Sequence, residues 1–201
     1  FFAITCSNDQ MLRTKANELA QKFIITDGHI DTPWKLSKNY EDISLRTKTG
    51  DFDYVRAKEG GLDVPFMAIY IPSSYIETGG AKEKADSLID MVEQIANKDP
   101  DKFEIAYSLE DANRIFKEGK IALPMGMENG VGIENDINNL KHFYDRGIRY
   151  ITLTHSKDNL ICDSSYDEEK DTWGGLSPYG KKVVKEMNRL GIMVDISHVT
   201  D

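Results

Sequence analysis

The sequence predicts an α/β protein in which helices cover a parallel β-sheet. Short apolar runs alternate along the 201 residues with amphipathic stretches, which is typical of buried parallel strands joined by helices. Hydrophobic residues make up 40% of the chain, enough for a sizeable core. A doubly wound sheet and a (β/α)8 barrel both fit this alternation, and no nucleotide-binding glycine fingerprint follows the first apolar run.

The chain begins with two apolar runs that are interpreted as strands. The first, residues 22–28, contains an apolar triplet at 23–25 and ends in turn residues, so we expect a buried strand there. The second covers residues 62–71, where Pro65 predicts an irregular or edge-like start. Residues 80–98 then form a predicted amphipathic helix. Its apolar face consists of Ala85, Leu88, Ile89, Val92 and Ile95.

The middle of the chain contains shorter elements. In order, these are a strand over 103–107, a helix over 109–118 and a strand over 121–127. Asn135 is then expected to cap a helix over 136–146, since Asp136 suits its first turn and Gly147 lies just past its end. Residues 150–154 form the next predicted strand.

The last helix has the clearest start signal. It follows a polar, turn-rich loop over 156–176, and Ser177 suits its N-cap while Pro178 suits its first helical position. Gly191 ends the helix, and residues 192–196 form another apolar strand. The inner face of this helix consists of Val183, Val184, Met187 and Leu190.

The composition excludes several classes of partner. The net charge is −9 and the pI is near 5.0, which argues against nucleic acid and against an anionic membrane surface. No apolar stretch approaches the ~20 residues of a membrane-spanning helix. Cys6 and Cys162 are too few for a disulfide framework and too far apart for a CxxC metal site, so we expect two free thiols.

Residues 1–20 are interpreted as an N-terminal segment that contains a first helix. The stretch from Phe1 to Cys6 resembles the end of a bacterial lipoprotein signal, with Cys6 as the lipidated residue that anchors the protein to a membrane. Thr5 is unusual before such a cysteine, and a frayed terminus is the alternative. This pattern favours the cell envelope, as a lipoprotein or periplasmic protein, over the cytoplasm.

Metal-binding residue types follow four of the predicted strands, at the edge where α/β folds build their sites. His29 and Asp31 follow the first strand, and as residues i and i+2 of an extended segment they point the same way. Glu128, His155 and His198 each follow a later strand. A set of His, Asp and Glu suits Zn²⁺ better than Mn²⁺ or Fe²⁺, and the two oxygens of a carboxylate can bridge two ions.

These positions indicate a metal site only when taken together, because any one of them alone is weak evidence for a bound metal. A single histidine at a strand end is more often hydrogen-bonded on the surface or in the core than bound to a metal. His142 provides the contrast, since it lies within the 136–146 helix and is interpreted as structural or exposed.

Several local sequences resemble motifs of the membrane (renal) dipeptidase family of zinc metallopeptidases. They occur in family order over about residues 23–200, nearly the whole chain. The run from Glu186 to Val199 matches best. The others are Asp27 to Trp34 (DGHIDTPW), Met127 to Gly130 (MENG), Tyr150 to His155 (YITLTH) and Gly175 to Gly180 (GLSPYG).

The resemblance implies a TIM barrel of the amidohydrolase type, with residues 21–201 as the N-terminal portion of a dipeptidase domain and about five of the eight strands present. It implies two zinc ions and hydrolysis of dipeptides by a hydroxide that bridges them. It also implies tolerance of D-residues at the dipeptide C-terminus, and of β-lactams in some members. The implied roles are His29 and Asp31 on the first zinc, Glu128 bridging both, His198 on the second zinc, and His155 contacting the substrate and steadying the oxyanion.

The chain departs from the family pattern at Asn129, where a glycine is common. In the family, a second histidine for the second zinc, a proton-shuttling Asp and a carboxylate-binding Arg lie beyond the position of Asp201. We therefore expect these 201 residues alone to be inactive and prone to aggregate. The 156–176 loop, with Tyr166 and Trp173, is either a roof over the pocket or a solvated connection.

Two other functions stay open. Another metal-dependent amidohydrolase, such as a deacylase or lactonase, shares the His-x-Asp motif but usually has a metal-bridging lysine in place of a residue such as Glu128. A catalytically inactive binding protein of the same fold is the second alternative. A homodimer is compatible with either function.

Overall fold

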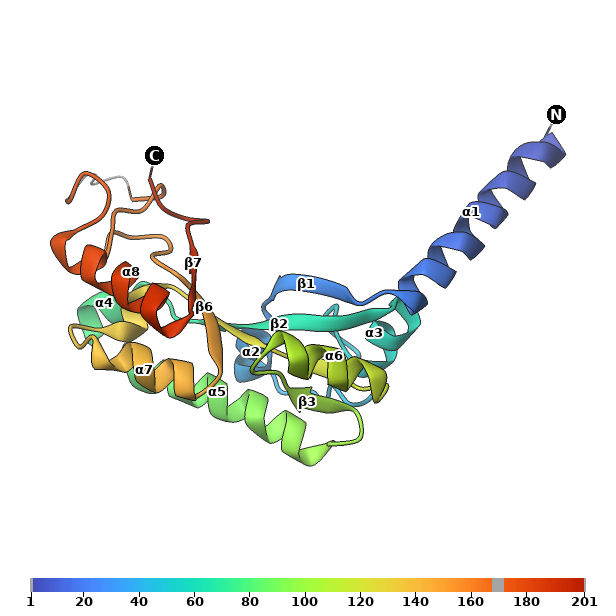
Figure 1. Cartoon of the computed structure of the whole chain (residues 1–201), viewed down its shortest axis with the longest axis horizontal. Coiled ribbons are helices and arrows are strands. Elements are labelled where there is room, and N and C mark those ends of the chain that lie inside the picture. The colour runs from blue at the N-terminus through green and yellow to red at the C-terminus, as the bar shows by residue number, and fades with distance from the viewer. Residues whose placement is uncertain (1, 168–171, 201) are drawn as a thin grey trace.

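The computed structural model describes the backbone of residues 2–167 and 172–200, and the side chains from residue 9 onward within those ranges. Its main sheet contains five described strands in the order β1-β2-β5-β6-β7, and each pairs in parallel with the next (Figure 1). Their bounds are β1 (Ile25–Ile30), β2 (Leu62–Tyr70), β5 (Met125–Glu128), β6 (Ile148–Thr152) and β7 (Met193–Asp195).

The strand order separates the two folds that the sequence left open. Each new strand of the main sheet is added beside the previous one, always in the same direction along the described chain. A doubly wound sheet instead reverses its strand order at a switch point. Consecutive addition is how a (β/α)8 barrel grows, so the sheet has the topology of the first part of a barrel.

A second, two-stranded parallel sheet corrects the prediction of one strand over 121–127. The structure has two strands there, β4 (Ile121–Leu123) and β5, and β4 pairs with β3 (Phe103–Ile105) rather than with the main sheet. Pro124 separates β4 from β5 and has no N–H to donate to a ladder. Its carbonyl accepts a hydrogen bond from the Met67 N–H at 2.8 Å.

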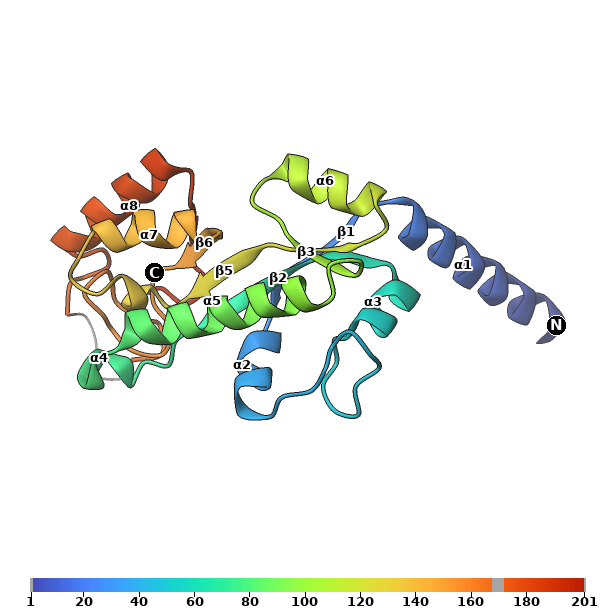
Figure 2. The same ribbon diagram turned by 90° about the horizontal axis from the view of Figure 1, so that it is seen from below.

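Helices pack alongside these sheets, and α5 runs along the main sheet (Figure 2). The periodicity predicted α5 to within one residue, and its five predicted core residues are all buried. The short helices α2, α3 and α4 were not predicted. The helical segments are α1 (Phe2–Lys22), α2 (Thr32–Lys38), α3 (Tyr54–Gly60), α4 (Tyr75–Thr78), α5 (Ala81–Lys98), α6 (Leu109–Lys117), the 3-10 turn η1 (Gly130–Ile133), α7 (Asn138–Asp145) and α8 (Pro178–Leu190).

The cap predictions were confirmed for α8 and wrong for α7. The Ser177 side chain accepts a hydrogen bond from the Gly180 N–H, and Gly191 ends α8 with a φ of +84°. At α7 the N-cap is Ile137, not Asn135. Asp136 provides the side chain there, because its Oδ1 accepts from the Asn138 N–H at 3.0 Å.

The strand β1 differs from its prediction in both place and burial. It begins at Ile25, because the chain up to Lys22 is helical, and it is mostly exposed rather than buried. The reason is its position, since β1 forms one edge of the described sheet and pairs with β2 alone. Apolar residues in β1 therefore lack the neighbours that bury the central strands.

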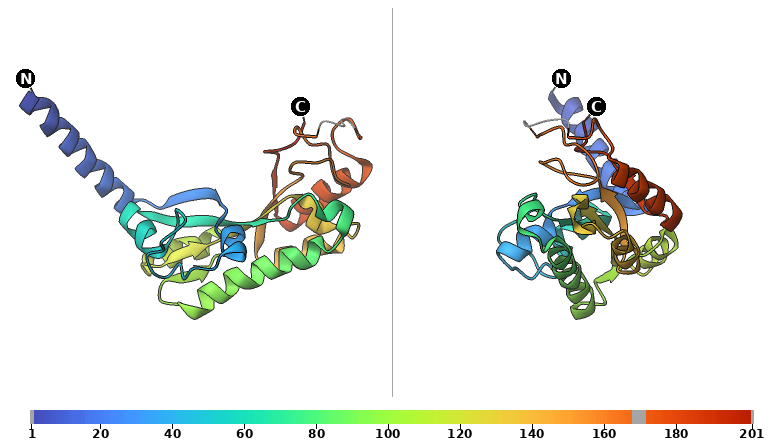
Figure 3. Two further views of the ribbon diagram at one scale, coloured as in Figure 1. Left: turned by 180° about the vertical axis from the view of Figure 1, so that it is seen from behind. Right: turned by 90° about the vertical axis from the view of Figure 1, so that its left-hand side faces the viewer.

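The N-terminal helix α1 projects away from the rest of the chain, and its last turn lies near α3 (Figures 1 and 3). Gln21 donates to the Lys58 carbonyl at 3.0 Å. The side chain of Cys6 lies outside the described residues, so its lipidation stays a prediction. In the part of the chain that the structure describes, no helix combines the length and apolar character needed to cross a bilayer.

Cys162 lies in the core as a free thiol, as predicted. Burial raises its pKa to about 12, because a low-dielectric environment disfavours the thiolate. This cysteine is therefore a packing residue rather than a nucleophile.

Candidate metal centre at the strand ends

The structure brings together the five residues that the sequence singled out. His29 lies in β1 and Asp31 directly follows that strand, while Glu128 is the last residue of β5. His155 and His198 lie in the segments that leave β6 and β7. Because the strands are parallel, their carboxyl ends meet at one edge of the sheet, and segments up to 169 positions apart in sequence converge there.

The first group of candidate ligands is His29, Asp31 and Glu128. The Nε2 atom of His29 lies 3.6 Å from Oδ1 of Asp31 and 3.4 Å from Oε2 of Glu128. One ligand atom from each of the three residues lies within 4.8 Å of the others. An imidazole nitrogen and two carboxylate oxygens at this spacing suit a Zn²⁺ ion.

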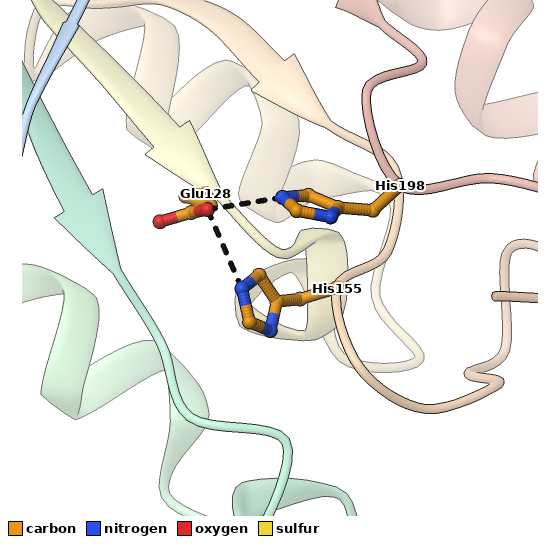
Figure 4. A group of neighbouring side chains, drawn as sticks. All are labelled: Glu128, His155 and His198. Carbon is orange, nitrogen blue, oxygen red and sulfur yellow. Dashed lines mark hydrogen bonds and ion pairs between the residues drawn. The ribbon is translucent and has the colours of Figure 1, made fainter. Parts of the chain in front are cut away.

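The second group is Glu128, His155 and His198 (Figure 4). Oε1 of Glu128 lies 3.5 Å from Nε2 of His155 and 3.3 Å from Nε2 of His198. The ring centroids of the two histidines are 4.5 Å apart. Glu128 thus belongs to both groups, with Oε2 facing one and Oε1 facing the other, as a carboxylate that bridges two cations must.

The electrostatic environment keeps Glu128 ionised. Burial raises its pKa, but the hydrogen bond with His29 and the charges of His29, His155 and His198 lower it, and the net pKa lies below its usual value. The pKa of His29 is raised, chiefly by its hydrogen bond with Glu128. Burial lowers the pKa of His155, which favours the neutral imidazole that can bind a metal or donate to a substrate.

Tyr150 contacts the candidate site at a position that the sequence did not indicate. Its hydroxyl lies 2.8 Å from Nδ1 of His29, on the opposite side of the ring from the candidate ligand atom. Gly126 makes room for it, since a Cβ at that position would lie 2.0 Å from the Tyr150 ring. The contact joins residues 121 positions apart, so no local pattern signals it.

A cavity of about 490 Å³ adjoins the candidate ligands and is lined by residues from the ends of β1, β5, β6 and β7. Its volume lies within the usual range for small-molecule sites. Tyr70 contacts His155 edge-on at a ring-centroid distance of 5.0 Å. Burial raises the pKa of Tyr70, so its hydroxyl is neutral at neutral pH.

The two aromatic residues of the 156–176 loop have different environments. The Tyr166 ring lies 5.6 Å from the His198 ring and is 64% exposed, so it stands beside the site. Trp173 is tied into the loop itself, because its indole N–H donates to the Asn159 carbonyl at 2.8 Å and its backbone N–H donates to Asp163. Trp173 therefore anchors the loop, and residues 168–171 lie outside the described residues.

His142 does not join the site. It lies in α7, and its Nε2 is 2.8 Å from Oδ1 of Asp86 on α5. Its role is structural, as predicted, because this contact joins two neighbouring helices.

The sequence matches one family of peptidases. The family described as membrane dipeptidase, peptidase family M19, matches residues 13–201. An uncharacterised dipeptidase of Schizosaccharomyces pombe is 34% identical over 201 residues, which cover 92% of this chain and 49% of that protein. Dipeptidase tcpJ of Claviceps purpurea is 34% identical over 188 residues, which cover 87% of this chain and 44% of that protein.

Solved structures of dipeptidases share the fold. The probable dipeptidase PvdM from Pseudomonas aeruginosa has a TM-score of 0.84 at 27% identity, over 95% of this chain and 50% of that one. Dipeptidase AC, a metallo peptidase, has a TM-score of 0.77 at 26% identity, over 89% of this chain and 57% of that one. The curled parallel sheet is therefore half of a TIM barrel, as the resemblance implied.

The chain spans about half the length of the curated relatives that it matches. The family match covers every residue of the strand-end site, including both groups of candidate ligands. The chain belongs to the membrane dipeptidase family, peptidase family M19.

Proposed function

We propose that the protein is a zinc-dependent dipeptidase that hydrolyses the peptide bond of dipeptides. The observation that carries this proposal is the position of Glu128, whose two oxygens face two separate groups of candidate ligands at one end of the sheet. Such a position suits a pair of metal ions that share one carboxylate. The relatives named as dipeptidases, and the size of the adjoining cavity, support a dipeptide as the substrate.

The donor atoms of this chain fit two Zn²⁺ ions. His29 and Asp31 would hold the first ion, Glu128 would share both, and His198 would hold the second. Nδ1 of His198 is buried without a partner in the described residues, and Nε2 faces Glu128, so Nε2 is the nitrogen placed for a metal. When bound, the two ions supply Lewis acidity to the substrate carbonyl and lower the pKa of water.

The side chains of the site then act on the substrate around that chemistry. Glu128 stays ionised and needs no proton removed before it binds metal, because the histidines lower its pKa. His155 is neutral near pH 7 and its Nε2 faces the site, so it is placed to donate a hydrogen bond to the oxygen that becomes negative during attack. Tyr70 packs against His155 and restrains its ring.

The experiment that tests the function uses the full-length protein and compares the wild type with Glu128→Gln in zinc content and dipeptide hydrolysis. We expect two zinc ions per wild-type chain. The variant should lose zinc, and its activity should fall at least about 100-fold. Even residues that only support metal ligands contribute roughly 10–100-fold to metal affinity or activity. Glu77→Gln, an exposed glutamate in α4, is the matched control and should behave as wild type.

The same assay separates the alternatives. Activity that survives Glu128→Gln would exclude the strand-end site as the catalytic centre. A panel of dipeptides and N-acyl amino acids distinguishes a dipeptidase from a deacylase, because turnover of the acyl amino acids alone would rule out the dipeptidase. A wild-type protein without zinc and without hydrolysis would instead support a binding protein of the same fold.

A further inference from the structure

Asn129 directly follows Glu128 and has a backbone conformation that few side chains adopt. Its φ is +81°, and among the described residues Glu134 is the only other non-glycine residue with positive φ. Asn129 is also fully buried, at 0% exposure. A strained residue of this kind persists only where the surrounding structure holds it in place.

The side chain of Asn129 makes the contacts that hold it. Its Nδ2 donates to the Ile71 carbonyl at 3.0 Å, and its Oδ1 accepts from the Val131 N–H at 3.3 Å. The Ile71 N–H in turn donates to the Glu128 carbonyl at 3.1 Å. Ile71 is thus bonded to both residues, which fixes the end of β5 to the segment that leaves β2.

The same amide reaches the segment that carries His155. Oδ1 of Asn129 also accepts from Nδ2 of Asn159 at 3.3 Å, and Asn159 donates to the Leu153 carbonyl at 2.9 Å. Leu153 lies two residues before His155. The buried Asn129 side chain therefore connects the strand end that presents Glu128 with two backbone segments, one at Ile71 and one at Leu153.

A second branch of the network passes through two serines. Nδ2 of Asn129 lies 3.4 Å from Oγ of Ser73, which lies 2.9 Å from Oγ of Ser156. Ser156 directly follows His155. The hydroxyls give a second connection between Asn129 and the His155 segment, independent of Asn159.

We propose that Asn129 is a positioning residue, which holds the strand end that presents the Glu128 carboxylate through this network and thereby sets the affinity of the site for zinc. This inference rests on the proposed function and adds to it a residue outside the ligand set. Glycine tolerates the same φ but has no amide to bond Ile71, Val131 or Asn159. The contribution of Asn129 is therefore its hydrogen bonds rather than its backbone alone.

The test measures zinc affinity by competition with a chelator, and the melting temperature of the metal-free protein, for Asn129→Gly. This variant keeps a permitted φ and removes the amide. We expect zinc affinity to fall by about tenfold or more, as when other supports of metal ligands are removed. Asn139→Ala is the matched control. Asn139 lies in α7, outside the ligand groups, and its buried amide donates to the Ile133 carbonyl at 3.0 Å.

The control should lower the melting temperature and leave zinc affinity unchanged. If Asn129→Gly gives that same result, Asn129 has a purely structural role and the inference is wrong. If Asn129→Gly does not fold, Ser73→Ala decides, with an expected affinity loss of roughly threefold for one weak hydrogen bond. An unchanged affinity in that variant also overturns the inference, whereas wild-type protein that binds no zinc contradicts the proposed function instead.

Discussion

Tyr150 contacts the ring nitrogen of His29 that points away from the other candidate ligands. Nε2 of His29 faces Asp31 and Glu128, so a metal bound there leaves Nδ1 protonated and donating to the Tyr150 hydroxyl at 2.8 Å. The hydroxyl cannot act as an anion at neutral pH, because burial raises the pKa of Tyr150. Tyr150 therefore acts as a hydrogen-bond acceptor that fixes the ring and its tautomer.

We predict that Tyr150→Phe weakens zinc binding by roughly 10-fold, because the ring of His29 loses the partner that orients it. Chelator competition measures the change. Tyr179→Phe is the matched control, since its buried hydroxyl has no hydrogen-bond partner among the described residues and its removal should leave zinc affinity unchanged. Equal affinities in wild type and Tyr150→Phe would show that the hydroxyl does not support the site.

A second residue-scale prediction separates the roles of two histidines that both face Oε1 of Glu128. We expect His198→Ala to hold one zinc ion per chain, and His155→Ala to keep two while kcat falls about 100-fold, as for loss of an oxyanion donor. Zinc content and steady-state kinetics measure both. One zinc ion in His155→Ala would make His155 a metal ligand and would contradict its role at the substrate.

The residues that the sequence could indicate are those whose position follows from the fold alone. His29, Asp31 and Glu128 were identified because parallel strands end at a common edge of the sheet, and the apolar runs in the sequence show where each strand ends. Asn129 and Tyr150 act through contacts between segments distant in sequence, so their roles depend on three-dimensional packing. The sequence shows that Asn129 is an unusual residue after Glu128, but it does not show which groups the Asn129 amide is hydrogen-bonded to.

At the scale of elements, a cluster of charges joins α5 to α7. Asp86 on α5 accepts from Nζ of Lys82 at 2.8 Å and from Arg146 at 3.0 Å, and it also contacts His142. Burial raises the pKa of Asp86, but its hydrogen bonds with Lys82 and His142 lower it, and the net pKa lies below 3.8. The ionised carboxylate is thus more stable in the folded protein than in the unfolded chain.

We predict that Asp86→Asn lowers the free energy of unfolding by about 2 kcal/mol at pH 7, typical of a hydrogen-bonded charge. The folded pKa is depressed, so the contribution is complete above the unfolded value of 3.8 and disappears as pH falls through the folded pKa. Urea titrations at several pH values measure it. Asp90→Asn, which removes an exposed contact to the same Arg146, should cost under about 1 kcal/mol; equal losses would refute the central role of Asp86.

Elements were predictable where their own residues decide their structure. The helix α5 has a long apolar face, and α8 has Ser177 and Gly191 at its ends, so both follow from local sequence. The burial of β1 and the division between β4 and β5 do not, because they depend on which strands lie alongside. Pro124 marks a possible break, but only the sheet determines that β4 pairs elsewhere.

At the scale of the whole molecule, the five described strands form an open sheet with β1 and β7 at its edges. Edge strands present unpaired N–H and C=O groups that can pair with another chain. Apolar side chains accompany the β7 edge, since Met193 is 55% exposed and Ile196, one residue beyond the strand, is 65% exposed. Hydrogen-bonding groups and apolar surface thus coincide at the same edge.

We therefore predict that these 201 residues, produced by themselves, self-associate through the β7 edge. Light scattering over a range of protein concentrations measures the association. Met193→Lys places a charge at that edge and should reduce association, because desolvating an ammonium opposes strand pairing. Leu45→Lys changes an equally apolar, 58% exposed residue in a loop and should leave association unchanged. A protein that stays monomeric at every concentration would show that the open edge does not promote association.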